Sequence, residues 1–180
     1  MEIPRWPLLG FTAWLLVASC GIAAPSAATS EATAATATVD TAAETSRLQA
    51  GVNTLRESQS IGGLAFPAAL QQVALARALE TAARGRLDHI RLGESTAAVL
   101  PMLEADGYSG RVAEHLILVK DPGEGLAATV LRTWFEDAAH RADLLDPGYQ
   151  ASGLGIAAAA QGWVIAQVLV ESVPSGEAQP

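Results

Sequence analysis

Two apolar runs separated by a two-residue break constrain the fold of this 180-residue chain more than any other feature. Residues 152–160 (SGLGIAAAA) and 163–172 (WVIAQVLVES) flank Gln161 and Gly162. Two apolar runs around a short glycine-containing break are typical of a β-hairpin. We therefore predict an antiparallel hairpin over residues 152–172.

The preceding residues show mainly helical periodicity. Apolar residues at positions 48, 52 and 55, and again at 126, 130 and 134, repeat at the spacing of one helix face. Pro67 suits a helix start and Gly85 a helix stop. The breaker-free run 111–120 predicts a further strand. We expect helices at 45–58, with Thr45 or Ser46 as cap, and at 67–84, 95–107 and 126–138. This order predicts an α+β domain whose small, mainly antiparallel sheet is covered by helices.

Composition and charge limit the possible functions. Half of the residues are hydrophobic, which is enough for one domain with a sizeable core. The 19 acidic and 11 basic side chains give a net charge of −8, which argues against nucleic-acid binding because phosphates would be repelled. The chain has one cysteine, Cys20, so an internal disulfide framework is excluded.

The first 20 residues have the pattern of an export signal. An apolar run of signal-peptide length follows Arg5 and ends in VASC, which resembles the lipobox of bacterial lipoproteins. This predicts lipidation of Cys20 and anchoring in the cell envelope, at the outer membrane in a Gram-negative cell. The alternative is an ordinary secretory signal cut after Ala23 or Ala24, which would make the protein periplasmic or secreted.

The segment between the signal and the domain is rich in alanine, threonine and serine. Residues 21–44 contain few large apolar side chains, so they cannot bury enough surface to offset the entropy lost on ordering. We predict a disordered linker over 21–44, a folded domain over 45–172 and a disordered tail over 173–180.

An ordered set of motifs resembles the CAP superfamily of cysteine-rich secretory proteins, antigen 5 and pathogenesis-related proteins, in its bacterial SCP-like branch. The resemblance covers about residues 46–172. The quoted stretches are VNTLR, RGRLDH, DGYSGRVAEHL and TWFEDAAHRADLLDPGYQASGLGI. The resemblance implies an α-β-α sandwich with a cleft formed by two histidines and two acidic residues.

Three of the four cleft positions are matched in this chain. The resemblance implies that His89 and His140 are the cleft histidines and that Glu114 is one acid, while Thr129 stands where the second acid is expected. Strand alternation places His115 on the opposite face from Glu114 and hence outside the cleft. Taken alone, each of the two predicted cleft histidines would more simply be a surface residue near a helix end. Glu114 would simply face solvent.

The family resemblance implies that the paired histidines can hold a divalent metal such as zinc, with the carboxylates orienting them. Thr129 removes one negative charge, so we expect weak zinc binding by His89 and His140. The favoured function is a lipid-anchored module that binds a lipid, a sterol or a cell-wall component without catalysis. The alternative is a metal-dependent hydrolase of peptide or wall substrates, with Glu114 as general base.

Overall fold

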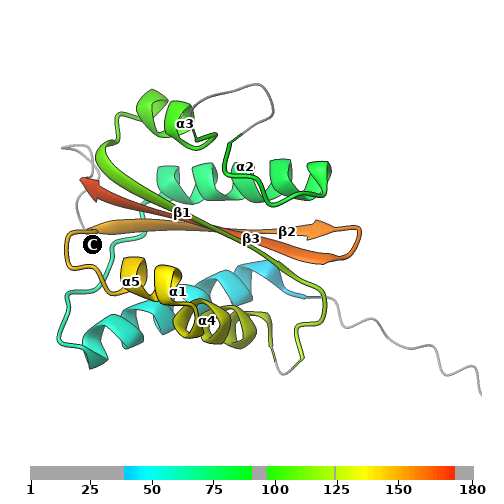
Figure 1. Cartoon of the computed structure of the whole chain (residues 1–180), viewed down its shortest axis with the longest axis horizontal. Coiled ribbons are helices and arrows are strands. Elements are labelled where there is room, and N and C mark those ends of the chain that lie inside the picture. The colour runs from blue at the N-terminus through cyan, green and yellow to red at the C-terminus, as the bar shows by residue number, and fades with distance from the viewer. Residues whose placement is uncertain (1–38, 91–96, 124, 173–180) are drawn as a thin grey trace, which may run out of the picture. The chain divides into compact units, whose positions relative to one another are not determined.

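The computed structural model describes residues 39–90, 97–123 and 125–172 (Figure 1). The predicted signal peptide, Cys20, residues 21–38 of the predicted linker and the predicted tail lie outside the described residues. Within those described ranges, no helix combines the length and the apolar character needed to span a membrane.

A three-stranded antiparallel sheet forms the centre of the domain. The strand order is β1-β3-β2, so the last strand in the sequence lies between the other two. The strands are β1 (Ser109–Val119), β2 (Ala151–Ala159) and β3 (Gly162–Ser172). The predicted hairpin is confirmed, because β2 and β3 pair in register up to Ala159 opposite Gly162.

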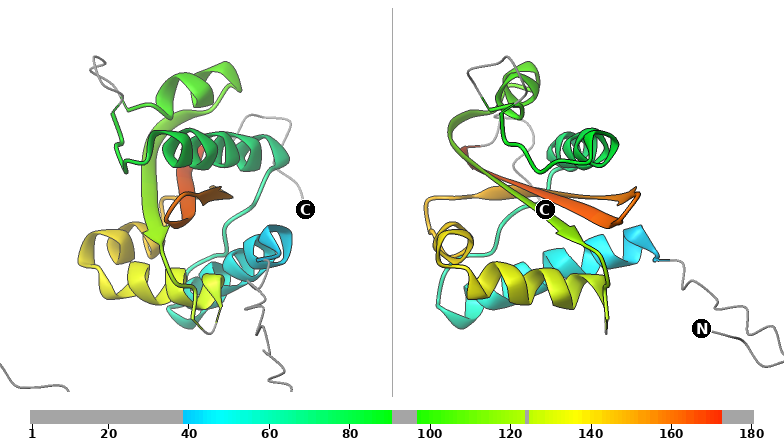
Figure 2. Two further views of the ribbon diagram at one scale, coloured as in Figure 1. Left: turned by 90° about the vertical axis from the view of Figure 1, so that its right-hand side faces the viewer. Right: turned by 45° about the vertical axis from the view of Figure 1, so that its right-hand side comes forward.

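Helices cover both faces of this sheet, which confirms the predicted α-β-α sandwich (Figures 1 and 2). One face carries α2 (Ala68–Arg84) and α3 (Leu100–Ala105). The other carries α1 (Thr41–Ser58), α4 (Leu126–Glu136) and α5 (Ala138–Leu144). As predicted, α2 follows Pro67 and ends at Gly85, whose φ of 68° suits a residue without a Cβ.

Alternate residues of β1 point to the two helical layers. Val112, Leu116 and Leu118 pack with residues of the α2 layer, whereas Ala113 and Ile117 pack with the core formed by α1 and α4. This is the period of two expected of a strand. Neighbouring residues of β1 therefore belong to different sides of the sheet, which decides what surrounds each candidate site residue.

The first helix begins earlier than predicted. The Asp40 side chain accepts a hydrogen bond from the backbone N–H of Ala43 and caps α1 at Thr41. Residues 41–44, predicted as linker, therefore belong to the helix. Thr45 and Ser46, predicted as caps, instead donate hydrogen bonds to carbonyls four residues earlier.

A short fifth helix was not predicted. The side chain of Asp137 accepts hydrogen bonds from the backbone N–H groups of Ala139 and His140, which starts α5 directly after α4. His140 therefore lies in the first turn of α5, beyond the end of the helix predicted over 126–138.

One buried arginine connects three separate segments. The guanidinium of Arg56 donates hydrogen bonds to the carbonyl oxygens of Gly62, Leu144, Asp146 and Tyr149 at 2.8–3.2 Å. Arg56 is 1% exposed. The side chain thus fixes the end of α1 and the loop after it against the loop between α5 and β2.

Two glycines allow α2 to lie directly on β2. A Cβ atom at Gly153 would overlap the backbone of Leu70, and one at Gly155 would overlap the backbone of Ala74 and Leu75. Gly153 and Gly155 are two residues apart and so share a face of the strand. The absence of side chains at these positions sets the distance between the helix and the sheet.

Candidate functional site

Glu114 on β1 lies between an arginine and a histidine. Its carboxylate accepts a 2.6 Å hydrogen bond from Arg77 Nε and a longer one, 3.4 Å, from Arg77 Nη2. The Nδ1 atom of His89 lies 2.8 Å from Glu114 Oε2. Glu114 and Arg77 are almost fully buried, whereas the His89 side chain is 54% exposed. The structure therefore joins two of the predicted cleft residues and leaves one side of the imidazole open to solvent.

Further contacts fix Arg77 in this arrangement. Its Nη1 atom lies 2.8 Å from Glu80 Oε2, and its Nη2 atom donates to the carbonyl oxygen of Asp88 at 3.1 Å. The guanidinium thus connects α2, the residues after α2 and strand β1. A planar fork of donors is well suited to holding a carboxylate through both oxygens.

These contacts shift the pKa of both ionisable partners. Burial opposes ionisation of Glu114, but hydrogen bonds from His89 and Arg77 outweigh burial and lower the pKa of Glu114. The hydrogen bond with Glu114 raises the pKa of His89 above its usual value. At neutral pH Glu114 is therefore a carboxylate held in an ion pair, which makes it a weak base.

We expect the imidazole of His89 to titrate above about 6.5, the usual histidine value, and Glu114→Gln to move its pKa back down. Because the folded-state pKa is raised, the stabilising contribution is complete below the unfolded-state value and is lost as pH rises through the folded-state value. Imidazole NMR titrations of both proteins measure this directly. Glu80→Gln, which also removes a carboxylate beside Arg77, is the control and should leave the titration of His89 nearly unchanged. Equal pKa values for His89 with and without Glu114 would contradict the pairing.

His140 belongs to a second group of side chains. Its ring is perpendicular to that of His115, with centroids 4.6 Å apart, and the centroid of Trp134 lies 6.5 Å away. Its Nδ1 atom is 3.0 Å from Asp137 Oδ1 but lacks a hydrogen bond there, because the geometry is unfavourable. We call His115, Trp134 and His140 the histidine–tryptophan cluster.

Both ring nitrogens of His115 have polar neighbours. Nδ1 lies 3.1 Å from Gln167 Oε1, and Nε2 lies 3.2 Å from Asp143 Oδ2. Burial lowers the pKa of His115, although the contact with Asp143 opposes this effect. The expectation that His115 faces away from Glu114 is confirmed, but His115 does not stand apart from the predicted cleft residues, because it contacts His140.

Thr129 has a different local role from the acid expected at its position. Its hydroxyl donates a 3.0 Å hydrogen bond to the carbonyl oxygen of Pro122 in the turn before α4. A carboxylate could not make this bond because it has no hydrogen to donate. The threonine therefore stabilises the start of α4.

The described residues provide no group of three His, Cys, Asp or Glu side chains arranged to hold a metal ion. His89 contacts Glu114 on the α2 side of the sheet, whereas His140 contacts His115 on the opposite side. A shared cation on His89 and His140 remains a prediction.

Two residues of this region were not recognised as site residues from the sequence. Arg77 lies on the buried face of α2, where a lone charge requires a buried partner. His115 was assigned to the far side of β1, and its contact with His140 depends on the unpredicted helix α5. A lone arginine and a lone glutamate on two core-facing elements were the available signal for the Arg77–Glu114 pair.

Comparisons with known proteins agree with this architecture. An extracellular protein of Bacillus anthracis with an SCP domain has a TM-score of 0.60 at 16% identity, covering 73% of this chain and 41% of that one. An outer surface protein of Borrelia burgdorferi has a TM-score of 0.65 at 15% identity, covering 75% and 97%. A cysteine-rich secretory protein of Staphylococcus aureus has a TM-score of 0.55 at 16% identity, covering 74% and 40%.

These likenesses concern the fold, and the chain spans less than half of the Bacillus and Staphylococcus proteins. No curated protein matches the sequence. The model of the cysteine-rich secretory protein family, CAP, matches residues 49–170. This match includes β1 and β2, most of β3, and helical residues on both faces of the sheet. The chain therefore belongs to the CAP family of cysteine-rich secretory proteins.

Proposed function

We propose that this protein is an exported, envelope-anchored CAP domain that binds the acyl chain of an anionic lipid. Export is supported by the apolar N-terminal run and by fold relatives that are described as extracellular or as an outer surface protein. Anchoring through Cys20 is supported by the VASC sequence, which would hold the domain near a lipid surface.

The observation that carries this proposal is an apolar groove between α1 and α4. The groove has a volume of about 340 Å³ and is lined by Gly51, Thr54, Leu55, Leu131, Arg132 and Phe135. Phe135 is 36% exposed and contributes apolar surface that is still in contact with water. Covering such a surface with an alkyl chain is favourable.

The groove also has a preferred charge for its ligand. Among the described residues that line it, Arg132 alone is charged. A guanidinium beside an apolar groove would attract the carboxylate or phosphate of a lipid while the groove covers the chain. A fatty acid or an anionic phospholipid fits both features, whereas a neutral wall sugar would leave the apolar lining uncovered.

Thr54→Trp should weaken fatty-acid binding at least about tenfold, because an indole would fill the groove that the alkyl chain needs and two buried methylene groups already correspond to this factor. Thr54 is an exposed residue of α1 whose hydroxyl bonds back to Ala50, so the substitution leaves the core unchanged. Equilibrium dialysis of the full-length chain with tritiated oleate measures the affinity.

Ser46→Trp is the matched control. Ser46 is also an exposed α1 residue with a hydroxyl bonded one turn back, but it does not line the groove. The control should bind oleate as the wild type does. If Thr54→Trp and Ser46→Trp bind oleate equally tightly, the groove is not the lipid site.

The second candidate function is a metal-dependent hydrolase. It is favoured by one feature: Glu114 holds His89 through Nδ1, as carboxylates do for metal-ligating histidines, and no described residue forms a hydrogen bond with Nε2. Two features oppose it. The described residues include no group of three potential ligands, and Arg77 already neutralises the carboxylate that would act as base. These two features make the hydrolase the less favoured function.

The same protein preparation distinguishes the two functions. The hydrolase requires the full-length chain, purified without chelator, to contain about one zinc per molecule, and requires a His89→Ala/His140→Ala variant to lose it. The lipid-binding proposal requires no metal, so oleate binding should be the same in both proteins. Zinc at full occupancy that depends on both histidines would favour the hydrolase.

A further inference from the structure

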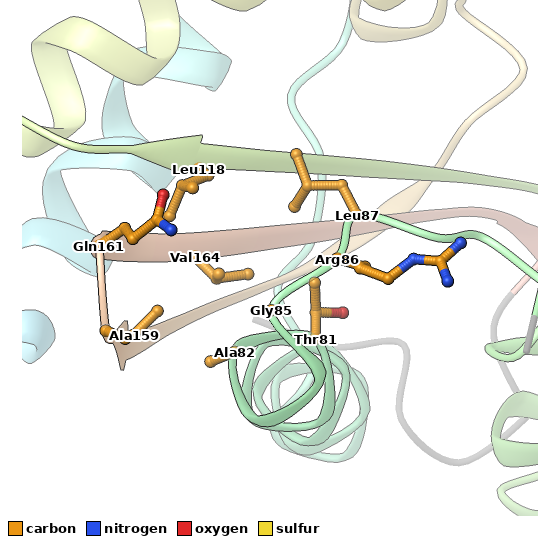
Figure 3. Close-up of a pocket in the computed structure, with 10 residues that line it drawn as sticks. Thr81, Ala82, Gly85, Arg86, Leu87, Leu118, Ala159, Gln161 and Val164 are labelled. Carbon is orange, nitrogen blue, oxygen red and sulfur yellow. The ribbon is translucent and has the colours of Figure 1, made fainter.

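A small cavity lies at the end of α2, on the opposite side of the sheet from the apolar groove between α1 and α4. It is enclosed between the last turn of α2, the residues just after it, and the β2–β3 hairpin (Figure 3). Its volume is about 80 Å³, and its apolar lining includes Ala82, Leu87, Leu118, Ala159 and Val164. We call it the α2-end cavity.

The size of the α2-end cavity restricts what can fill it. An apolar cavity of about 150 Å³ stays dry and accepts benzene, so a cavity of 80 Å³ suits a branched group of three or four carbons. Leu87 forms part of the wall and is still 44% exposed. A ligand that enters the cavity would also cover this leucine.

Polar groups occur at the rim of the cavity and in its wall. Figure 3 shows Gln161 at one end of the lining and Arg86 at the other, with Thr81 on the same side as Arg86. Thr81 is 1% exposed, and its hydroxyl has no hydrogen-bond partner within the described part of the chain. A buried hydroxyl normally has a hydrogen-bond partner. A ligand in the cavity could supply the partner that the Thr81 hydroxyl needs.

At this end of the cavity the guanidinium of Arg86 can donate to an anion. Among the described residues Arg86 pairs with Asp88, through Nε at 3.1 Å and Nη2 at 3.4 Å. Both side chains are well exposed, so the pair is weak, and the remaining guanidinium N–H groups are available as donors. Asp88 and the carbonyl end of α2 oppose an anion. The helix end carries only about half a charge, and a carboxylate can bind the guanidinium together with Asp88 because the fork has five N–H donors.

We propose that the α2-end cavity binds a carboxylate that carries a short branched alkyl group, with the alkyl group inside and the carboxylate at Arg86 and Thr81. Two sources share this chemistry: a free branched short-chain acid, and the C-terminal leucine or valine of a peptide. Binding at the α2-end cavity does not depend on the apolar groove between α1 and α4. Each of the two proposals can therefore fail without affecting the other.

Methyl NMR of the full-length chain, followed at Leu87, Leu118 and Val164, tests this proposal. We expect 4-methylpentanoate to bind saturably, with a dissociation constant on the order of 1 mM, as is reasonable for a ligand of eight heavy atoms. Hexanoate has the same carbon count and charge but no branch. It should bind about fourfold more weakly for each methylene group that stays in water. N-acetyl-leucine tests the peptide source, and the tighter of the two branched ligands identifies the source.

Three variants separate the parts of the site. Ala159→Leu should fill the cavity and abolish saturable binding, while the remaining methyl spectrum shows that the domain is folded. Arg86→Gln should weaken 4-methylpentanoate about tenfold, as expected for loss of a charge-assisted hydrogen bond, but should not weaken 4-methylpentanamide. Arg84→Gln removes a neighbouring exposed arginine that does not line the cavity. This variant should bind 4-methylpentanoate as tightly as the wild type. The proposal is overturned if neither branched ligand binds, if Ala159→Leu binds like the wild type, or if the amide binds as tightly as the acid.

Discussion

Replacing Arg56 with methionine is expected to lower the free energy of unfolding by about 3–5 kcal/mol, an effect in the range seen when buried charge networks are broken. Four carbonyl oxygens, one after α1 and three between the end of α5 and β2, would lose their donor at once, and a buried unsatisfied acceptor destabilises a fold strongly. Arg56→Lys should also be destabilising, because a lysine ammonium has three donors and cannot reproduce the planar fork. Domains are stable by only about 5–15 kcal/mol, so the methionine variant should be close to unfolding at 37 °C.

Urea unfolding followed by circular dichroism measures this effect, provided that the dependence on urea concentration stays constant between variants. Arg47→Met is the matched control on the same helix. The Arg47 side chain is 64% exposed and makes one ion pair, with Glu44, so its loss should change stability by no more than about 1 kcal/mol. An Arg56→Met protein as stable as the control would show that the loops around α1 are held by other contacts.

Gly155→Ala is expected to destabilise the domain by about 2–3 kcal/mol through overpacking. The added methyl group would meet the backbone of Ala74 and Leu75 in α2, which cannot move aside as a flexible side chain can. Either α2 must shift away from the sheet or β2 must distort, and both changes loosen the core that contains Leu70, Val73 and Val168.

Thermal unfolding monitored by calorimetry suits this prediction, because packing losses lower both the midpoint and the enthalpy of unfolding. Gly62→Ala is the control: a Cβ there meets no atom within 4 Å and the backbone does not require a glycine. The control should be neutral or slightly stabilising, since alanine restricts the unfolded chain. If the Gly155→Ala and Gly62→Ala variants unfold at the same temperature, α2 and β2 are not in close contact.

The elements with strong local signals were predicted well from the sequence. The hairpin could be predicted because its two apolar runs flank a Gln-Gly pair. The end of α2 could be predicted because Gly85 adopts a left-handed conformation that other residues avoid. In both cases the determining physics lies within a few residues.

The errors arose where the structure depends on longer-range contacts or on weak local signals. The start of α1 was placed too late because residues 41–44 resemble the linker in composition, while the cap at Asp40 and the packing of Val39 against the core determine the boundary. Helix α5 was missed because seven residues give little periodicity, although Asp137 was a usable N-cap signal.

The site was harder to predict than the fold. The family resemblance named His89 and Glu114, and the structure places them 2.8 Å apart. The resemblance could not reveal that Arg77 holds the Glu114 carboxylate, because that contact joins residues 37 positions apart on a helix and a strand. The contact of His115 with His140 likewise depends on how α5 packs beneath the sheet.

The central position of β3 has a consequence for how the chain folds during synthesis. Strands β1 and β2 do not pair with each other. Both pair with β3, which leaves the ribosome after them. Until β3 emerges, nearly every interstrand hydrogen bond of the sheet is missing, so a growing chain can form helices but not the sandwich. Such a chain would stay loosely folded while it is being made, which is the state in which a polypeptide can be threaded through a translocation channel.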